Sequence, residues 1–85
     1  MANRADVQRV VFDTLEFLLQ DKPDAPEPTL ETKVKEVGID SLDIVEVLME
    51  LEEEYDVNIP DSAVAECDTV DDLISLAMKI IEENG

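Results

Sequence analysis

The sequence predicts an all-α fold, a small four-helix bundle with three longer helices and one short helix. Apolar residues recur at spacings of three and four in three separate stretches, as they do on one face of a helix. No stretch alternates apolar and polar residues as a half-buried strand does. A chain of 85 residues can enclose one small core but not two, so residues 1–85 are expected to form a single domain.

The first helix is expected over about residues 4–19. Asn3 stands immediately before it and is a residue type that caps helix N-termini. Phe12 and Phe17 are expected to add bulk near its core-facing side. That side is formed by Val7, Val10, Val11, Leu15, Leu18 and Leu19.

A proline-rich loop follows over residues 21–31. Pro23, Pro26 and Pro28 remove backbone donors within six residues and exclude a regular helix there. We expect a semi-rigid connector that lets the second helix return beside the first. A binding loop is the alternative.

The second long helix is expected over about residues 41–55, a run without Gly or Pro. Gly38 ends the preceding turn, and the Asp40 side chain can accept hydrogen bonds from the first free amides. At about 100° per residue, the side facing the core consists of Ile44, Val47, Leu48, Leu51 and Tyr55.

Another side of this helix carries only carboxylates, with Leu42 and Met49 as apolar residues beside them. Such a run is ordinarily a solvated helix face. Here, however, like charges at i, i+3 and i, i+4 have no compensating Lys or Arg, which costs a few tenths of a kcal/mol per pair. The pattern therefore favours a surface for basic partners. Its acidic residues are Asp43, Glu46, Glu50, Glu53 and Glu54.

After the second helix, Pro60 disfavours a helical conformation at the residue before it. A short helix is expected over about residues 62–66, with Asp61 as its cap. Cys67 follows, and two interpretations exist for it: a reactive thiol or a small buried apolar residue. The second is favoured because no basic residue nearby in sequence would lower its pKa.

The last helix is expected over about residues 70–83. Thr69 and Asp72 have the spacing of a capping box, with Asp in place of Glu. The apolar stripe that follows consists of Val70, Leu73, Ile74, Ala77, Ile80 and Ile81.

The charge of the chain excludes several classes of function. Lys and Arg number 6 against 23 Asp and Glu, a net charge of −17, and residues 36–78 contain no basic residue. Such a surface repels nucleic acid and anionic membranes and attracts basic proteins. An acidic nucleic-acid mimic is a minor alternative. The oxygen ligands around the second helix do not follow the calcium-loop pattern, so we expect no metal site.

The absence of histidine removes His-based catalysis, and no base accompanies Ser41, so we expect neither catalytic residues nor enzymatic activity. The single cysteine excludes an intramolecular disulfide, and no segment is long and apolar enough to span a bilayer. We therefore expect a cytoplasmic monomer.

Ser41 opens the second helix, where the dipole is positive and a phosphate on its hydroxyl would be favoured. The segments 38–43 and 52–61 resemble the acyl carrier proteins, and the resemblance extends over about residues 34–81. It implies that a phosphopantetheinyl transferase attaches 4′-phosphopantetheine from coenzyme A to Ser41, with Mg²⁺ at the transfer site and assistance from Asp40. The residues it implies for contact with acyl-transferring and chain-elongating enzymes are Leu42, Asp43, Glu46, Met49, Glu50 and Glu53.

The resemblance also implies a role in fatty-acid, polyketide or related lipid biosynthesis. The alternative is a peptidyl or aminoacyl carrier, for example a D-alanyl carrier, which shares the fold and the modified serine.

Overall fold

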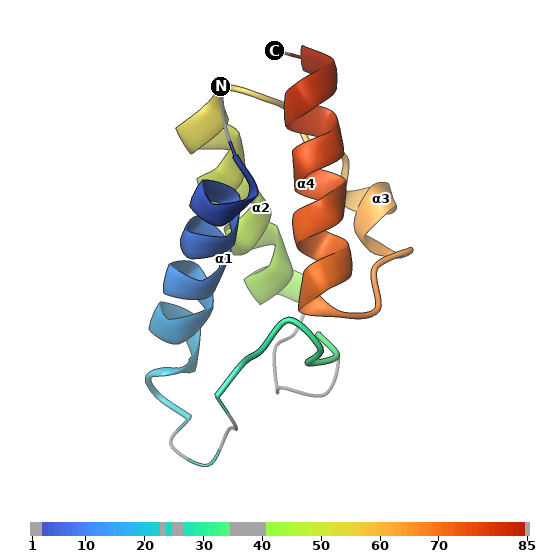
Figure 1. Ribbon diagram of the computed structural model, residues 1–85. Helices are drawn as coiled ribbons and strands as arrows, with labels where there is room; N and C mark the ends of the chain where they lie inside the picture. Colours follow the sequence, from blue (N-terminus) through green and yellow to red (C-terminus); the bar gives the residue numbers. More distant parts are fainter. Residues whose placement is uncertain (1–2, 23, 25–26, 35–40, 85) are drawn as a thin grey trace.

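The computed structural model describes residues 3–22, 24, 27–34 and 41–84. These residues form four helical segments: α1 (Arg4–Leu19), α2 (Ser41–Tyr55), α3 (Asp61–Val64) and α4 (Val70–Asn84). The expected all-α class is confirmed, because the only β-type pairing among the described residues is an isolated bridge between Lys33 and Thr69. α1 runs antiparallel to α2 and α4, and the single turn of α3 lies beside α4 (Figure 1).

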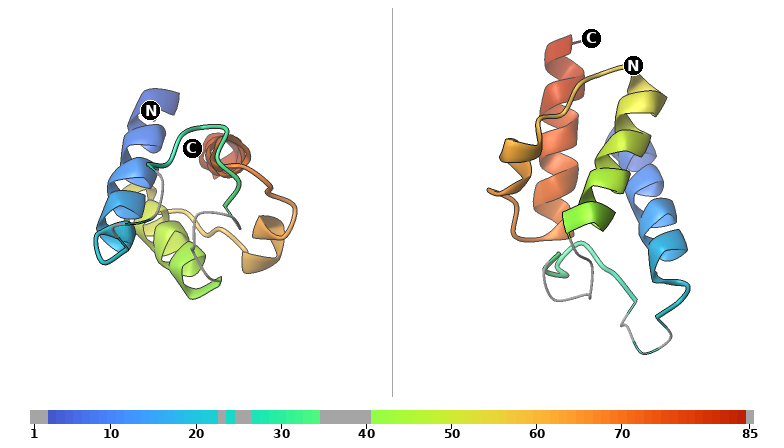
Figure 2. Two further views of the ribbon diagram at one scale, coloured as in Figure 1. Left: turned by 90° about the horizontal axis from the view of Figure 1, so that it is seen from below. Right: turned by 180° about the vertical axis from the view of Figure 1, so that it is seen from behind.

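The core is aliphatic and lies where α1, α2 and α4 face one another (Figure 2). Residues at i, i+4 spacing on α1 are buried, and the described residues include no buried polar or charged side chain. Burial of Val, Leu and Ile therefore supplies most of the stabilisation. The buried residues are Val7, Val11, Leu15, Leu19, Val34, Val47, Leu48, Leu51, Ile59, Cys67, Val70, Leu73, Ile74, Ala77 and Ile81.

α1 begins as predicted, because the Asn3 side chain accepts a hydrogen bond from the Asp6 amide at 2.9 Å. The expectation that Phe17 adds bulk near the core is wrong: 65% of its surface is exposed. Phe17 lies two residues after the buried Leu15, which is about 200° around the helix, so it points away from the core. Phe12 is half-buried and packs against the core.

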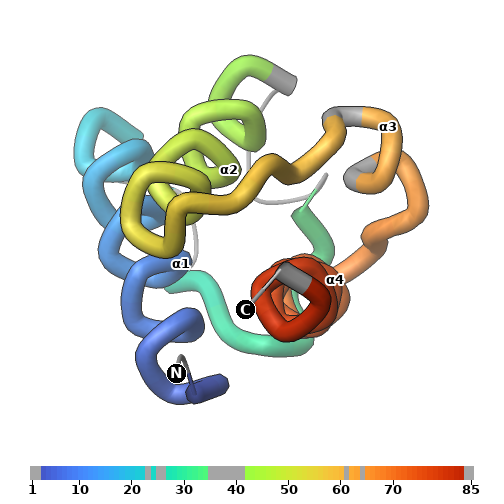
Figure 3. The backbone as a smooth tube through the Cα atoms, turned by 90° about the horizontal axis from the view of Figure 1, so that it is seen from above, coloured from blue at the N-terminus to red at the C-terminus, as the bar shows by residue number. Residues whose placement is uncertain are grey.

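Residues 27–34 pass beside α4 at the end where this helix begins (Figure 3). Their carbonyls accept hydrogen bonds from the first amides of α4. The Val70 amide donates to the Thr32 carbonyl at 2.9 Å, and the Asp71 amide donates to the Leu30 carbonyl at 2.9 Å. First-turn amides have no partner within their own helix. The loop after α1 therefore caps the N-terminus of the last helix.

Side chains complete the cap of α4 as the sequence predicts. The Asp72 amide donates to Thr69 Oγ1 at 3.1 Å, and Asp72 Oδ2 accepts from the Thr69 amide at 3.0 Å. The Asp68 amide also donates to Asp72 Oδ2, at 3.0 Å. This is the reciprocal arrangement of a capping box.

α3 differs from the helix expected over 62–66. It begins one residue earlier, so that Asp61 is its first residue and Pro60 its cap, with the Pro60 carbonyl accepting from the Ala63 amide at 3.1 Å. The two residues after α3 form a turn, because their amides bond to carbonyls three residues back rather than four.

Candidate functional site

The start of α2 carries the serine singled out by the sequence. Ser41 is the first residue of this helix, and Asp43 lies in its first turn. The N-terminal amides of a helix are partly positive and favour a phosphate group. The Ser41 side chain, Gly38 and Asp40 lie outside the part of the chain that the structure describes.

The first turn of α2 is accessible and tied to the end of α1. Leu42 has 75% of its surface exposed. Asp43 is half-buried, and its carboxylate lies 3.9 Å from Lys22 Nζ, just beyond α1. This ion pair joins the first turn of α2 to the residues just after α1. The contact of Lys22 was not predicted, because no local sequence pattern links residues as far apart as Lys22 and Asp43.

The predicted acidic face of α2 is exposed at Glu46, Glu50, Glu53 and Glu54. Met49 lies beside these carboxylates with 51% of its surface exposed. The apolar residues on the opposite side of the helix, Val47, Leu48 and Leu51, are buried. α2 therefore has a buried apolar face and an exposed charged face, as its periodicity predicts.

A groove of about 500 Å³ separates this face from α1, and Thr14 is among the α1 residues in its wall. The α1 wall of this groove was not predicted from the sequence. The signal that could have indicated this wall is Phe17, an aromatic residue two positions after the buried Leu15 and therefore off the core-facing stripe of α1. The α1–α2 groove is lined by Asp13, Thr14, Phe17, Glu46, Met49, Glu50 and Glu53.

Two contacts fix the C-terminal end of α2. Asp56 has a φ of 53°, and the Val57 amide donates to the Glu52 carbonyl at 3.3 Å, as in a Schellman ending. The Glu52 carboxylate then accepts from the amide of the buried Ile59 at 2.9 Å. The chain thus turns sharply from α2 toward α3, and the acidic face ends at a defined point.

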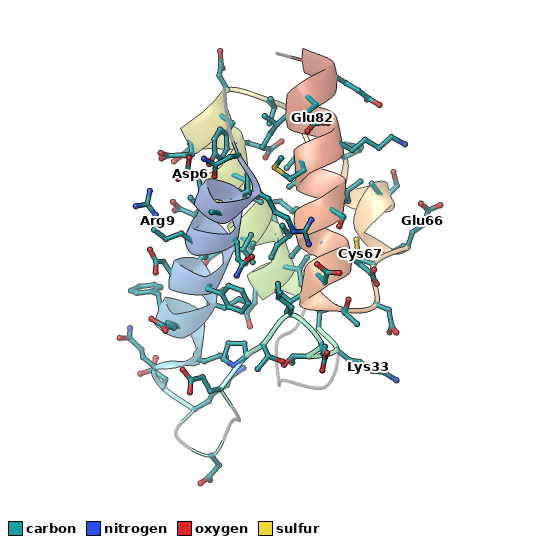
Figure 4. The ribbon with its side chains drawn as sticks, in the orientation of Figure 1. Asp6, Arg9, Lys33, Glu66, Cys67 and Glu82 are labelled. Carbon is teal, nitrogen blue, oxygen red and sulfur yellow. The ribbon has the colours of Figure 1, made fainter. Side chains whose placement is uncertain are left out.

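Charges from α1 lie close to this end of α2. Burial raises the pKa of Tyr55, Asp6 and Glu54 raise it further, and Arg9 lowers it. Figure 4 shows Asp6 and Arg9 on the first turns of α1. The start of α1 therefore lies beside the end of α2, as the antiparallel arrangement requires.

Cys67 is buried between α3 and α4 (Figure 4). Burial raises the pKa of its thiol, and the carboxylates of Asp72 and Glu66 raise it further. Its Sγ lies 3.9 Å from the Ala63 carbonyl. A buried thiol with a raised pKa is a weak nucleophile, so this environment matches the packing role.

The described residues contain no group of three or more His, Cys, Asp or Glu side chains placed to hold a metal ion. Within the same residues, no helix is both long and apolar enough to cross a membrane.

Comparison with known proteins shows which family shares this sequence and fold. Residues 13–77 match the family described as "Phosphopantetheine attachment site". The chain is 39% identical to an acyl carrier protein of Helicobacter acinonychis, over 99% of this chain and 96% of that protein.

Solved structures agree with the sequence relatives. The crystal structure of an acyl carrier protein from Thermotoga maritima matches with a TM-score of 0.69 at 26% identity, over 93% of this chain and 94% of that one. A carrier from the actinorhodin polyketide synthase of Streptomyces coelicolor, in its 3,5-dioxohexyl form, matches with a TM-score of 0.70 at 26% identity, over 100% and 96% of the two chains. The chain therefore belongs to the acyl carrier protein family, whose members contain a phosphopantetheine attachment site.

Proposed function

We propose that the chain holds acyl intermediates as thioesters on a 4′-phosphopantetheine arm attached to the Ser41 hydroxyl. The observation that carries this proposal is the position of Ser41 as the first residue of α2, within the matched residues 13–77. The neighbouring Leu42 is exposed, so an arm attached at this end of the helix extends into solvent. When bound, the arm supplies the thiol that carries the acyl group.

The residues around Ser41 have distinct roles in this proposal. The first-turn amides of α2 stabilise the negative charge of the phosphodiester. Asp40 assists the transfer from coenzyme A, which a phosphopantetheinyl transferase catalyses with Mg²⁺. The Ser41 hydroxyl would release its proton as its oxygen bonds to phosphorus, while the diphosphate linkage of coenzyme A breaks and the nucleotide leaves. The chain itself catalyses no reaction.

The exposed side of α2 is the proposed surface for acyl-transferring and chain-elongating enzymes. Carboxylates at the rim of an interface mainly raise the association rate, and their effect weakens with salt. Weak and rapid binding suits a carrier that delivers cargo to several enzymes in turn. The proposed contact residues are Leu42, Asp43, Glu46, Met49, Glu50 and Glu53.

The aliphatic core supports a role in sheltering cargo. No aromatic side chain is among the buried residues of the described chain. We propose that α3 is the short fourth member of the helical bundle and that small displacements between it and the longer helices admit an acyl chain. Aliphatic side chains present no polar group that the hydrocarbon would leave unpaired.

Attachment at Ser41 is tested by incubating the protein with coenzyme A and a transferase of broad specificity, followed by intact mass measurement. The expected result is the mass gain of one arm in the native protein and none in Ser41→Ala. Ser62→Ala is the matched control, because Ser62 also follows an aspartate at the start of a helix. A gain that persists in Ser41→Ala places the arm elsewhere, and no gain in any variant overturns the carrier proposal.

The type of cargo is tested by loading the arm-bearing protein. We propose fatty-acid, polyketide or related lipid biosynthesis, supported by relatives that are acyl carrier proteins. Loading by an acyl-carrier synthetase is expected. Loading by an amino-acid adenylating enzyme instead would favour the aminoacyl alternative. The single cysteine supports a reducing compartment, and we propose the cytoplasm and a monomeric state.

A further inference from the structure

The α1–α2 groove combines two exposed apolar side chains with an acidic rim. Phe17 of α1 is 65% exposed and Met49 of α2 is 51% exposed, and both line the groove. Single exposed apolar residues are common on protein surfaces. Two from different helices in one concave site indicate a place where an apolar group of another molecule is buried.

The charge around these two residues restricts what can bind there. Asp13, Glu46, Glu50 and Glu53 line the groove, and its lining includes no Lys or Arg. A second copy of this chain would bring a further net charge of −17 and be repelled. A segment rich in Lys and Arg is the complementary occupant.

The length of the groove fits a helix. Its α1 wall runs from Asp13 to Phe17, about one turn, and its α2 wall runs from Glu46 to Glu53, about two turns or ~10 Å. A short amphipathic helix can lay one apolar side chain against Phe17 and Met49 while its basic residues face the carboxylates on both walls.

We propose that the α1–α2 groove receives a basic amphipathic helix of a partner enzyme, with an apolar anchor seated on Phe17 and Met49. This inference rests on the proposed carrier function and extends the partner surface of α2 onto α1. Asp13 and Phe17 become determinants of partner binding, although both lie far along the chain from Ser41. The arm of the carrier then leaves from one end of the surface while the partner is held along its side.

The probe is a synthetic amphipathic peptide of about 14 residues containing Ala, Leu and Arg, long enough to form a helix when bound. It is titrated into the ¹⁵N-labelled protein while amide chemical shifts are recorded. The expected shifts cluster at the groove residues of α1 and α2. Phe17→Ala is expected to weaken binding at least about fivefold, because it removes the apolar wall. Gln20→Ala is the matched control for loss of an exposed, uncharged side chain at the end of α1 outside the groove lining, and it is expected to bind as the native protein does.

Charge is tested separately. Asp13→Asn is expected to weaken binding by about two- to threefold, whereas Glu16→Gln, an exposed α1 residue outside the groove lining, leaves it unchanged. Equal losses in both variants would show non-specific attraction and overturn the proposal. Shifts centred outside the groove, or undiminished binding to Phe17→Ala, would also overturn it.

The two proposals fail in different ways. Arm attachment is measured by intact mass in the native protein, separately from peptide binding, and thermal unfolding checks that Phe17→Ala is folded. A protein that takes up the arm but does not bind the peptide in the groove retains the carrier function and refutes the docking site. A protein that binds the peptide but never accepts the arm refutes the carrier function alone.

Discussion

At the scale of single residues, short-range hydrogen bonds define the helix ends. Asp72 accepts from two backbone amides, and its own amide donates to Thr69. The backbone hydrogen bonds from Thr69 and Asp68 lower the pKa of Asp72. The capping role of Asp72 was predictable because Thr69, its partner in the capping box, lies only three residues before it.

This lowered pKa predicts how the contribution of Asp72 to stability depends on pH. A carboxyl group whose pKa is lower in the folded state stabilises that state above its unfolded pKa of about 3.9 and loses the effect as the pH falls through its folded value. Asp72→Ala is therefore expected to unfold at a lower temperature than the native protein at pH 7, and the difference should narrow below about pH 4. Thermal unfolding followed by circular dichroism at several pH values measures it. A difference that stays constant down to pH 3 would contradict the role of the charged form.

At the scale of the element, α2 is held in place by the buried apolar residues that face the core, Val47, Leu48 and Leu51. Leu51 is fully buried, whereas Leu42 in the same helix is 75% exposed. The same substitution at these two positions therefore separates packing from surface effects. Leu51→Ala is expected to cost about 2–5 kcal/mol, and Leu42→Ala less than about 0.5 kcal/mol. Urea unfolding measures both, and similar losses at the two positions would contradict the assignment of the faces.

The helices and their inward faces were predictable because a period of 3.6 residues marks them directly in the sequence. The arrangement of one helix against another leaves no such local mark. Periodicity therefore puts Glu46 and Met49 on the exposed side of α2, as found, whereas the expectation that Phe17 adds bulk near the core is wrong. The contact of Lys22 with Asp43 and the α1 wall of the groove depend on how α1 and α2 meet, which periodicity alone does not specify.

At the scale of the whole molecule, self-repulsion opposes the compact state. A net charge of −17 is distributed over 85 residues. The ion pairs of Arg4 with Asp71 and of Lys22 with Asp43 are both partly exposed, and such pairs contribute about 0–1 kcal/mol each. Repulsion among the carboxylates therefore outweighs the local attractions that salt would weaken.

Salt is consequently expected to stabilise the protein. Raising NaCl to about 0.5 M shortens the range of electrostatic repulsion to a few Å. If this recovers about 1 kcal/mol, the melting temperature rises by about 4–8 °C for a domain of this size. Millimolar Mg²⁺ is expected to raise it further than NaCl of equal ionic strength. A melting temperature that is insensitive to both NaCl and Mg²⁺ would show that repulsion among the carboxylates does not destabilise the folded state.

The hydrogen bonds between residues 30–32 and the first amides of α4 also have a consequence for biosynthesis. During translation the carbonyls of Leu30 and Thr32 are synthesised well before the amides of Val70 and Asp71, which are their donors. Leu30 and Thr32 thus lack these two donors while α2 and α3 are synthesised. The nascent chain acquires its complete fold only after α4 has been synthesised, so a transferase that requires the folded carrier acts after that point.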